Sequence, residues 1–66
     1  MTNGLHRTAT AALADSDRRP MKPVFFNLAT RLYFVGDRLD APATGPGYWH
    51  ELTYRELAIA SAMENR

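Results

Sequence analysis

Residues 24–35 read VFFNLATRLYFV, and the secondary structure of this stretch decides the fold. As a helix, the stretch places its polar side chains, Asn27, Thr30 and Arg31, on one face. The apolar stripe opposite them consists of Val24, Phe25, Leu28, Ala29, Leu32 and Tyr33. Pro23 suits the first turn of such a helix, and Gly36 suits its end. Because a helix accounts for more of the polar positions than a strand does, we expect a helix here.

A strand is the alternative for the same stretch, whose composition also favours β-structure. One face of the strand would carry Val24, Phe26, Leu28, Leu32 and Phe34, interrupted only by Thr30. In that case Gly36-Asp37 would form a two-residue hairpin turn, and residues 38–40 would return as the second strand. The fold would then be α+β.

The flanking segments favour helices joined by Pro/Gly-rich connections. Residues 53–65 are predicted to be a helix, because Thr53 and Glu56 have the spacing of a capping box. Residues 2–17 read either as a weak helix capped by Asn3 or as a frayed tail, so residues 1–22 are a candidate flexible arm. Residues 40–50 are predicted to be a loop, because they contain four Pro and Gly residues: Pro42, Gly45, Pro46 and Gly47. We expect one domain over residues 1–66, mainly α, with two or three short helices.

Length and composition limit the chemistry that we expect. The chain has 66 residues, no cysteine and a net charge of +1. Disulfides and thiolate zinc sites are therefore excluded, and the two histidines, His6 and His50, are not spaced as a ligand pair. We expect no metal, no cofactor and no enzymatic activity. No segment approaches the roughly 18 apolar residues of a membrane span, so a cytoplasmic protein without membrane contact is expected.

The aromatic content favours a protein-binding module. Seven aromatic side chains are many for a core of this size, so some are expected to form an exposed interaction patch. The predicted interface consists of Phe25, Phe26, Arg31, Phe34, Arg38, Tyr48 and Trp49. Tyr48 and Trp49 also read as a plug that closes the core. A regulator or inhibitor of a larger complex is the expected role, with a homodimer as the simplest assembly and a structural small subunit as an alternative.

A second alternative comes from residues 52–58, which read LTYRELA. With Ser61, this segment resembles the start of the second helix in helix-turn-helix and winged-helix DNA-binding domains. The resemblance implies a scaffold for nucleic-acid association, but the chain ends at Arg66, where the recognition helix of that family would begin. Phosphate contacts would then come from the basic set Arg18, Arg19 and Lys22.

Overall fold

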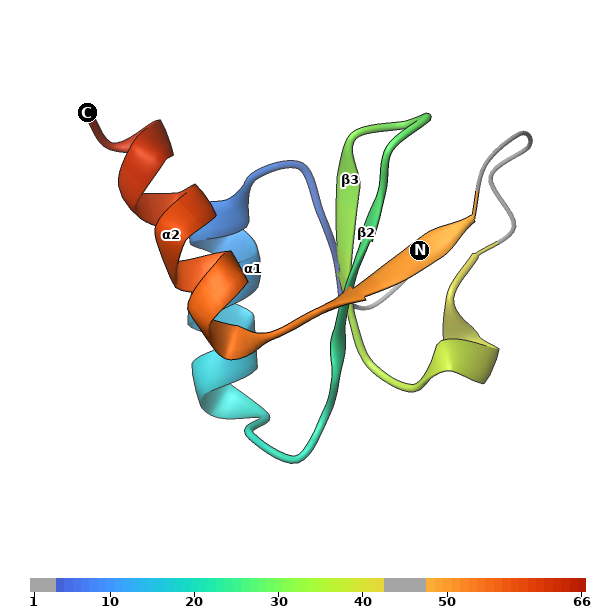
Figure 1. The fold of residues 1–66 in the computed structure, drawn as a ribbon. Coiled ribbons are helices and arrows are strands. Elements are labelled where there is room, and N and C mark those ends of the chain that lie inside the picture. The colour runs from blue at the N-terminus through green and yellow to red at the C-terminus, as the bar shows by residue number, and fades with distance from the viewer. Residues whose placement is uncertain (1–3, 43–47) are drawn as a thin grey trace.

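The computed structural model describes residues 4–42 and 48–66, and it has an α+β fold. Two helices cover one face of an antiparallel sheet with the strand order β1-β3-β2-β4 (Figure 1). The elements in chain order are β1 (Leu5–His6), α1 (Ala9–Arg18), β2 (Val24–Asn27), β3 (Leu32–Val35), a 3-10 turn η1 (Arg38–Asp40), β4 (Trp49–Leu52) and α2 (Tyr54–Glu64). The expected mainly α fold is therefore wrong, and the α+β alternative fits.

Residues 24–35 form a β-hairpin rather than a helix, and its turn is built by Asn27. The buried side-chain Oδ1 of Asn27 accepts hydrogen bonds from the backbone N–H groups of Ala29 (2.9 Å) and Thr30 (3.1 Å). The backbone N–H of Arg31 donates to the Asn27 carbonyl at 2.7 Å, and Arg31 takes a left-handed φ of 62°. The side chain of Asn27 thus satisfies two backbone N–H groups of the turn, while Arg31 takes the left-handed conformation that glycine adopts more readily.

The hairpin turn predicted at Gly36-Asp37 is in the wrong place. Gly36 follows β3 with a φ of 154°, and the chain continues into η1 instead of returning as a strand. Residues 38–42 then lie against the face of the sheet that the helices leave open, where Ala41 packs on the buried cluster. Of the predicted loop over residues 40–50, residues 43–47 lie outside the described part of the chain.

Both faces of the sheet are therefore buried, each in its own apolar cluster. On the helix face, Val24 and Val35 pack with residues of the two helices, Ala9, Ala12 and Leu57. On the opposite face, Phe25, Phe34 and Trp49 form the second cluster. Successive residues of β2 consequently enter different clusters, which gives this strand a continuous apolar sequence.

The two helices begin at side-chain caps. Thr8 caps α1 by accepting a hydrogen bond from Ala11, so the helix starts later than the predicted range of residues 2–17, and Asn3 lies outside the described residues. The capping box of α2 is confirmed: Thr53 Oγ1 accepts from the Glu56 N–H at 3.1 Å, and Glu56 Oε1 accepts from the Thr53 N–H at 2.8 Å. In the described parts of the chain, neither helix has the length and apolar character needed to cross a membrane.

Candidate functional site

Three of the seven predicted interface residues belong to the core. Phe25, Phe34 and Trp49 expose only 1%, 2% and 8% of their surface. The indole Nε1 of Trp49 donates to the Pro42 carbonyl at 2.8 Å, which fixes the ring beneath residues 38–42. Arg38 covers the same cluster, with its guanidinium 4.8 Å from the centre of the Phe25 ring. These three aromatic side chains therefore cannot form an exposed patch.

The other predicted aromatic residues, Phe26 and Tyr48, lie on the helix face of the sheet or next to it. Cross-strand pairing puts Phe26 between Tyr33 of β3 and His50 of β4. The Phe26 and Tyr33 rings are 4.7 Å apart, and the Tyr48 and His50 rings are 4.6 Å apart. A row of rings thus crosses the sheet and ends at the exposed pair Tyr48 and His50, where 70% of Tyr48 is accessible.

The edge of the sheet at β4 is open within the described residues. β4 pairs with β2 on one side, and no described strand pairs with its other side. Tyr48, His50 and Leu52 alternate along this edge, and the register of His50 with Phe26 and of Leu52 with Val24 puts both β4 side chains on the helix face. Such an edge presents unpaired backbone N–H and C=O groups next to an apolar and aromatic row, and can accept another strand.

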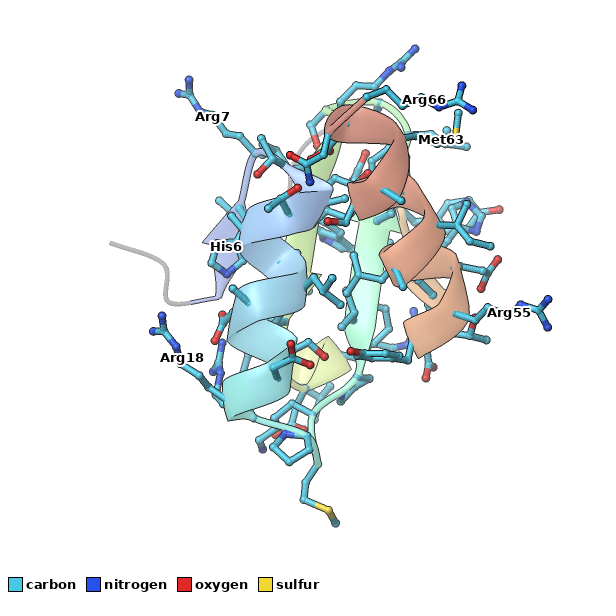
Figure 2. The ribbon with its side chains drawn as sticks, turned by 90° about the vertical axis from the view of Figure 1, so that its left-hand side faces the viewer. His6, Arg7, Arg18, Arg55, Met63 and Arg66 are labelled. Carbon is cyan, nitrogen blue, oxygen red and sulfur yellow. The ribbon has the colours of Figure 1, made fainter. Side chains whose placement is uncertain are left out.

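The outer side of α2 continues this surface. Ile59 and Met63, one turn apart, expose about half or more of their side chains. Arg55 and Arg66 flank them in sequence, and Figure 2 shows Arg55, Met63 and Arg66 pointing away from α1. We call Tyr48, His50, Leu52 and the open backbone edge of β4 the edge surface. Helix α2 contacts β4 and therefore lies next to this surface.

The predicted basic set is largely occupied by internal ion pairs. Arg19 Nη2 lies 2.6 Å from Asp15 Oδ2, and Lys22 Nζ lies 2.9 Å from Asp37 Oδ2. Of that set, Arg18 is the one residue that forms no ion pair within the described part of the chain, and it points outward, as does Arg7 just before α1 (Figure 2). Arg31 is exposed in the β2–β3 turn, away from the helices.

Asp15 is the centre of a polar network beside a shallow cavity of about 580 Å³ that His6, Arg18 and Arg19 help to line. His6 Nε2 lies 2.7 Å from Asp15 Oδ2, and Arg19 also donates to the Val35 carbonyl at 3.0 Å. The hydrogen bond from Arg19 holds the pKa of Asp15 below its usual value, against burial that raises it. The network joins α1 to β1 and β3, so its evident role is structural.

The carboxylates of the helical layer are likewise used internally. Glu64 accepts hydrogen bonds from the N–H groups of Ala9 (2.7 Å) and Thr10 (3.1 Å), and Asp17 accepts one from the Tyr54 hydroxyl. The bond from Ala9 is the main cause that lowers the pKa of Glu64. No group of three or more potential metal ligands occurs among residues 4–42 and 48–66.

Comparison with protein-family models, curated proteins and solved structures finds no match to this chain. The resemblance of residues 52–61 to a helix-turn-helix segment therefore stays a prediction. In the structure β4 leads into α2, and the helix expected over residues 24–35 is the β-hairpin. His50 and Leu52 are the surface residues that the sequence reasoning missed. Their signal was the alternation of Tyr48, His50 and Leu52 at a period of two.

Proposed function

We propose that this chain is a non-enzymatic protein-binding module that takes up an extended segment of a polypeptide along the open edge of β4. The observation that carries the proposal is the edge surface itself. It combines a strand edge without a described neighbour and a row of exposed side chains on one face. In strand addition, main-chain hydrogen bonds supply affinity, and the alternate side chains supply specificity.

A regulator or inhibitor is the role that this mode of binding supports best, because capture of an extended segment can withhold it from another protein. Tyr48 and Leu52 would contact apolar side chains of the captured segment, since both lie on the same face of the edge. A structural small subunit would use the same surface, with its partner bound permanently.

The experiment is the selection of random linear peptides by display against the immobilised chain. Selected peptides should perturb the NMR amide signals of residues 48–52, and His50→Asp should weaken their binding at least tenfold. Met21→Asp is the matched control, because it adds one negative charge at an exposed position outside the sheet. Peptides that perturb a different surface, or that bind His50→Asp as tightly as the unmodified chain, would refute the proposal.

Nucleic-acid association is a second candidate, favoured by the free arginines of the helical layer. Arg7, Arg18, Arg55 and Arg66 form no ion pair with a described residue, while Asp15, Asp17, Glu56 and Glu64 are engaged internally. Figure 2 shows these arginines pointing outward around the two helices. Four phosphate contacts would make the affinity fall steeply with salt.

Fluorescence anisotropy with duplex DNA and with RNA at about 50 and 200 mM salt tests this candidate. The double variant Arg18→Gln/Arg55→Gln should weaken binding and reduce its salt dependence. Arg31→Gln removes the same kind of charge from the hairpin turn and should do so far less. Binding that does not respond to salt, or no binding at low salt, would eliminate the candidate.

A further inference from the structure

We propose that the polypeptide that pairs with β4 is a second copy of this chain, in a two-fold symmetric dimer centred on His50. This inference rests on the proposed strand addition and specifies its partner. An isologous contact requires one surface to be complementary to itself. The edge surface meets this requirement in one register.

The faces of the sheet restrict the registers that are possible. A two-fold axis that makes two β4 strands antiparallel runs perpendicular to the sheet and keeps the helices of both copies on one face. Residues directly opposite each other in an antiparallel pair point to the same face. His50 and Leu52 point to the helix face and Glu51 to the other, as their pairing with Phe26, Val24 and Phe25 shows. Each residue must therefore face a residue of the same parity in the second copy.

Among those registers, pairing of His50 with His50 of the second copy uses the whole edge. It matches residues 48–52 of one chain with residues 52–48 of the other. Moving the centre to Trp49 or to Glu51 leaves some of residues 48–52 without a partner from the same segment of the other chain. A centre at Glu51 also puts two carboxylates opposite each other, which is unfavourable. The register centred on His50 is therefore the one that pairs all of residues 48–52 with one another and keeps the two Glu51 carboxylates apart.

The same register is complementary on both faces of the sheet. On the helix face, the exposed ring of Tyr48 lies opposite Leu52 of the second copy. The two-fold axis repeats this apolar contact at the other end of the strand pair. On the other face, Glu51 of the second copy lies opposite Trp49. Arg38 is exposed there and forms no ion pair with a described residue, and its Nη1 lies 3.5 Å from the Trp49 carbonyl. Arg38 and Glu51 of the second copy are thus placed to form two symmetry-related ion pairs.

Sedimentation equilibrium over a concentration series tests the dimer, and two variants of position 50 test its centre. The unmodified chain should form dimers and nothing larger. His50→Lys and His50→Asp should each weaken the dimer at least tenfold, because like charges then face each other about 5 Å apart. An equimolar mixture of the two variants should form a heterodimer, since Lys now faces Asp. That recovery would also show that both variants fold.

Met21→Lys and Met21→Asp are the matched controls, and both should dimerise like the unmodified chain. The inference is overturned if the chain stays monomeric throughout the series, or if the two His50 variants dimerise normally. It is also overturned if the mixture fails to associate. The peptides selected by display distinguish failure of the dimer from failure of the proposed strand addition. If peptides bind at residues 48–52 of a monomer, strand addition stands and only the identity of the partner is wrong.

Discussion

Replacement of Glu64 by alanine should destabilise the domain far more than its exposed position at the end of α2 suggests. Its two carboxylate oxygens accept hydrogen bonds from the first N–H groups of α1, those of Ala9 and Thr10, and Oε1 also accepts from the Thr10 hydroxyl at 3.1 Å. The last residue of one helix thereby caps the start of the other, 55 residues away in the chain. Thr8 satisfies only the N–H of Ala11 and cannot replace this contact.

The magnitude follows from the two backbone groups that lose their acceptor. Loss of a helix N-cap costs about 0.5 to 2 kcal/mol, and a negative charge at a helix N-terminus adds about 0.3 to 1 kcal/mol when exposed. We expect Glu64→Ala to lower the free energy of unfolding by about 1.5 kcal/mol, which corresponds to a melting temperature lower by about 6 to 12 °C in a domain of this size. Glu64→Gln keeps one acceptor and should cost less.

Urea unfolding followed by circular dichroism measures this loss, with Asp40→Ala as the control. Asp40 is exposed, and its carboxylate forms no ion pair with a described residue. Because the pKa of Glu64 in the folded state lies below its ordinary value of 4.5, its contribution is complete above pH 4.5 and disappears as the pH falls through the folded-state value. The difference between the unmodified chain and Glu64→Gln should therefore shrink as the pH is lowered from 4.5 through the folded-state pKa of Glu64. A Glu64→Ala loss equal to that of Asp40→Ala, or a difference independent of pH, would refute the reasoning.

Three further substitutions test the hairpin, β1 and the polar network. Asn27→Ala removes the buried acceptor of two backbone N–H groups of the hairpin turn. It should lower the free energy of unfolding, measured with urea, by about 2 to 3 kcal/mol. A loss below about 1 kcal/mol would mean that the turn forms without this acceptor. Gly4→Ala should detach β1 from β3, because Gly4 has a φ of 90° and the added Cβ would collide with the Val35 carbonyl oxygen. Amide hydrogen exchange should therefore become faster at Leu5 and stay unchanged in β4. Asp15→Asn should lower the free energy of unfolding by about 1 to 2 kcal/mol at neutral pH, because it weakens the hydrogen bonds from Arg19. Equal stability of the variant and the unmodified chain at neutral pH would contradict a structural role for this network.

The sequence predicts α2 well and the central hairpin poorly, for a physical reason. The capping box of α2 is a local signal, because Thr53 and Glu56 satisfy each other's backbone N–H groups whatever the rest of the chain does. A strand is usually recognised by the alternation that results when one face is buried. β2 is buried on both faces, so Val24 and Phe25 are both apolar, and the alternation disappears. The resulting run of apolar residues also fits a helix.

The candidate site could be predicted only in part, because burial depends on a contact distant in sequence. The interface predicted from the sequence includes Phe26 and Tyr48, and both side chains are at least partly accessible. It cannot distinguish them from Phe25, Phe34 and Trp49, which are covered by residues 38–42. Residues 40–42 fall within the predicted loop, and nothing local indicates that residues 38–42 fold back over the sheet.

The covering of the second face also explains why the surface that remains open is at β4. With the helices on one face and residues 38–42 on the other, the aromatic side chains in the middle of the sheet are buried, and accessibility increases from Phe26 to the edge at Tyr48 and His50. The side chains that hold the fold together and the exposed ones of the proposed binding edge thus occupy different strand positions. His50 can be exchanged for a charged residue without disturbing either apolar cluster, because it belongs to neither. This separation makes binding and stability measurable independently in this chain.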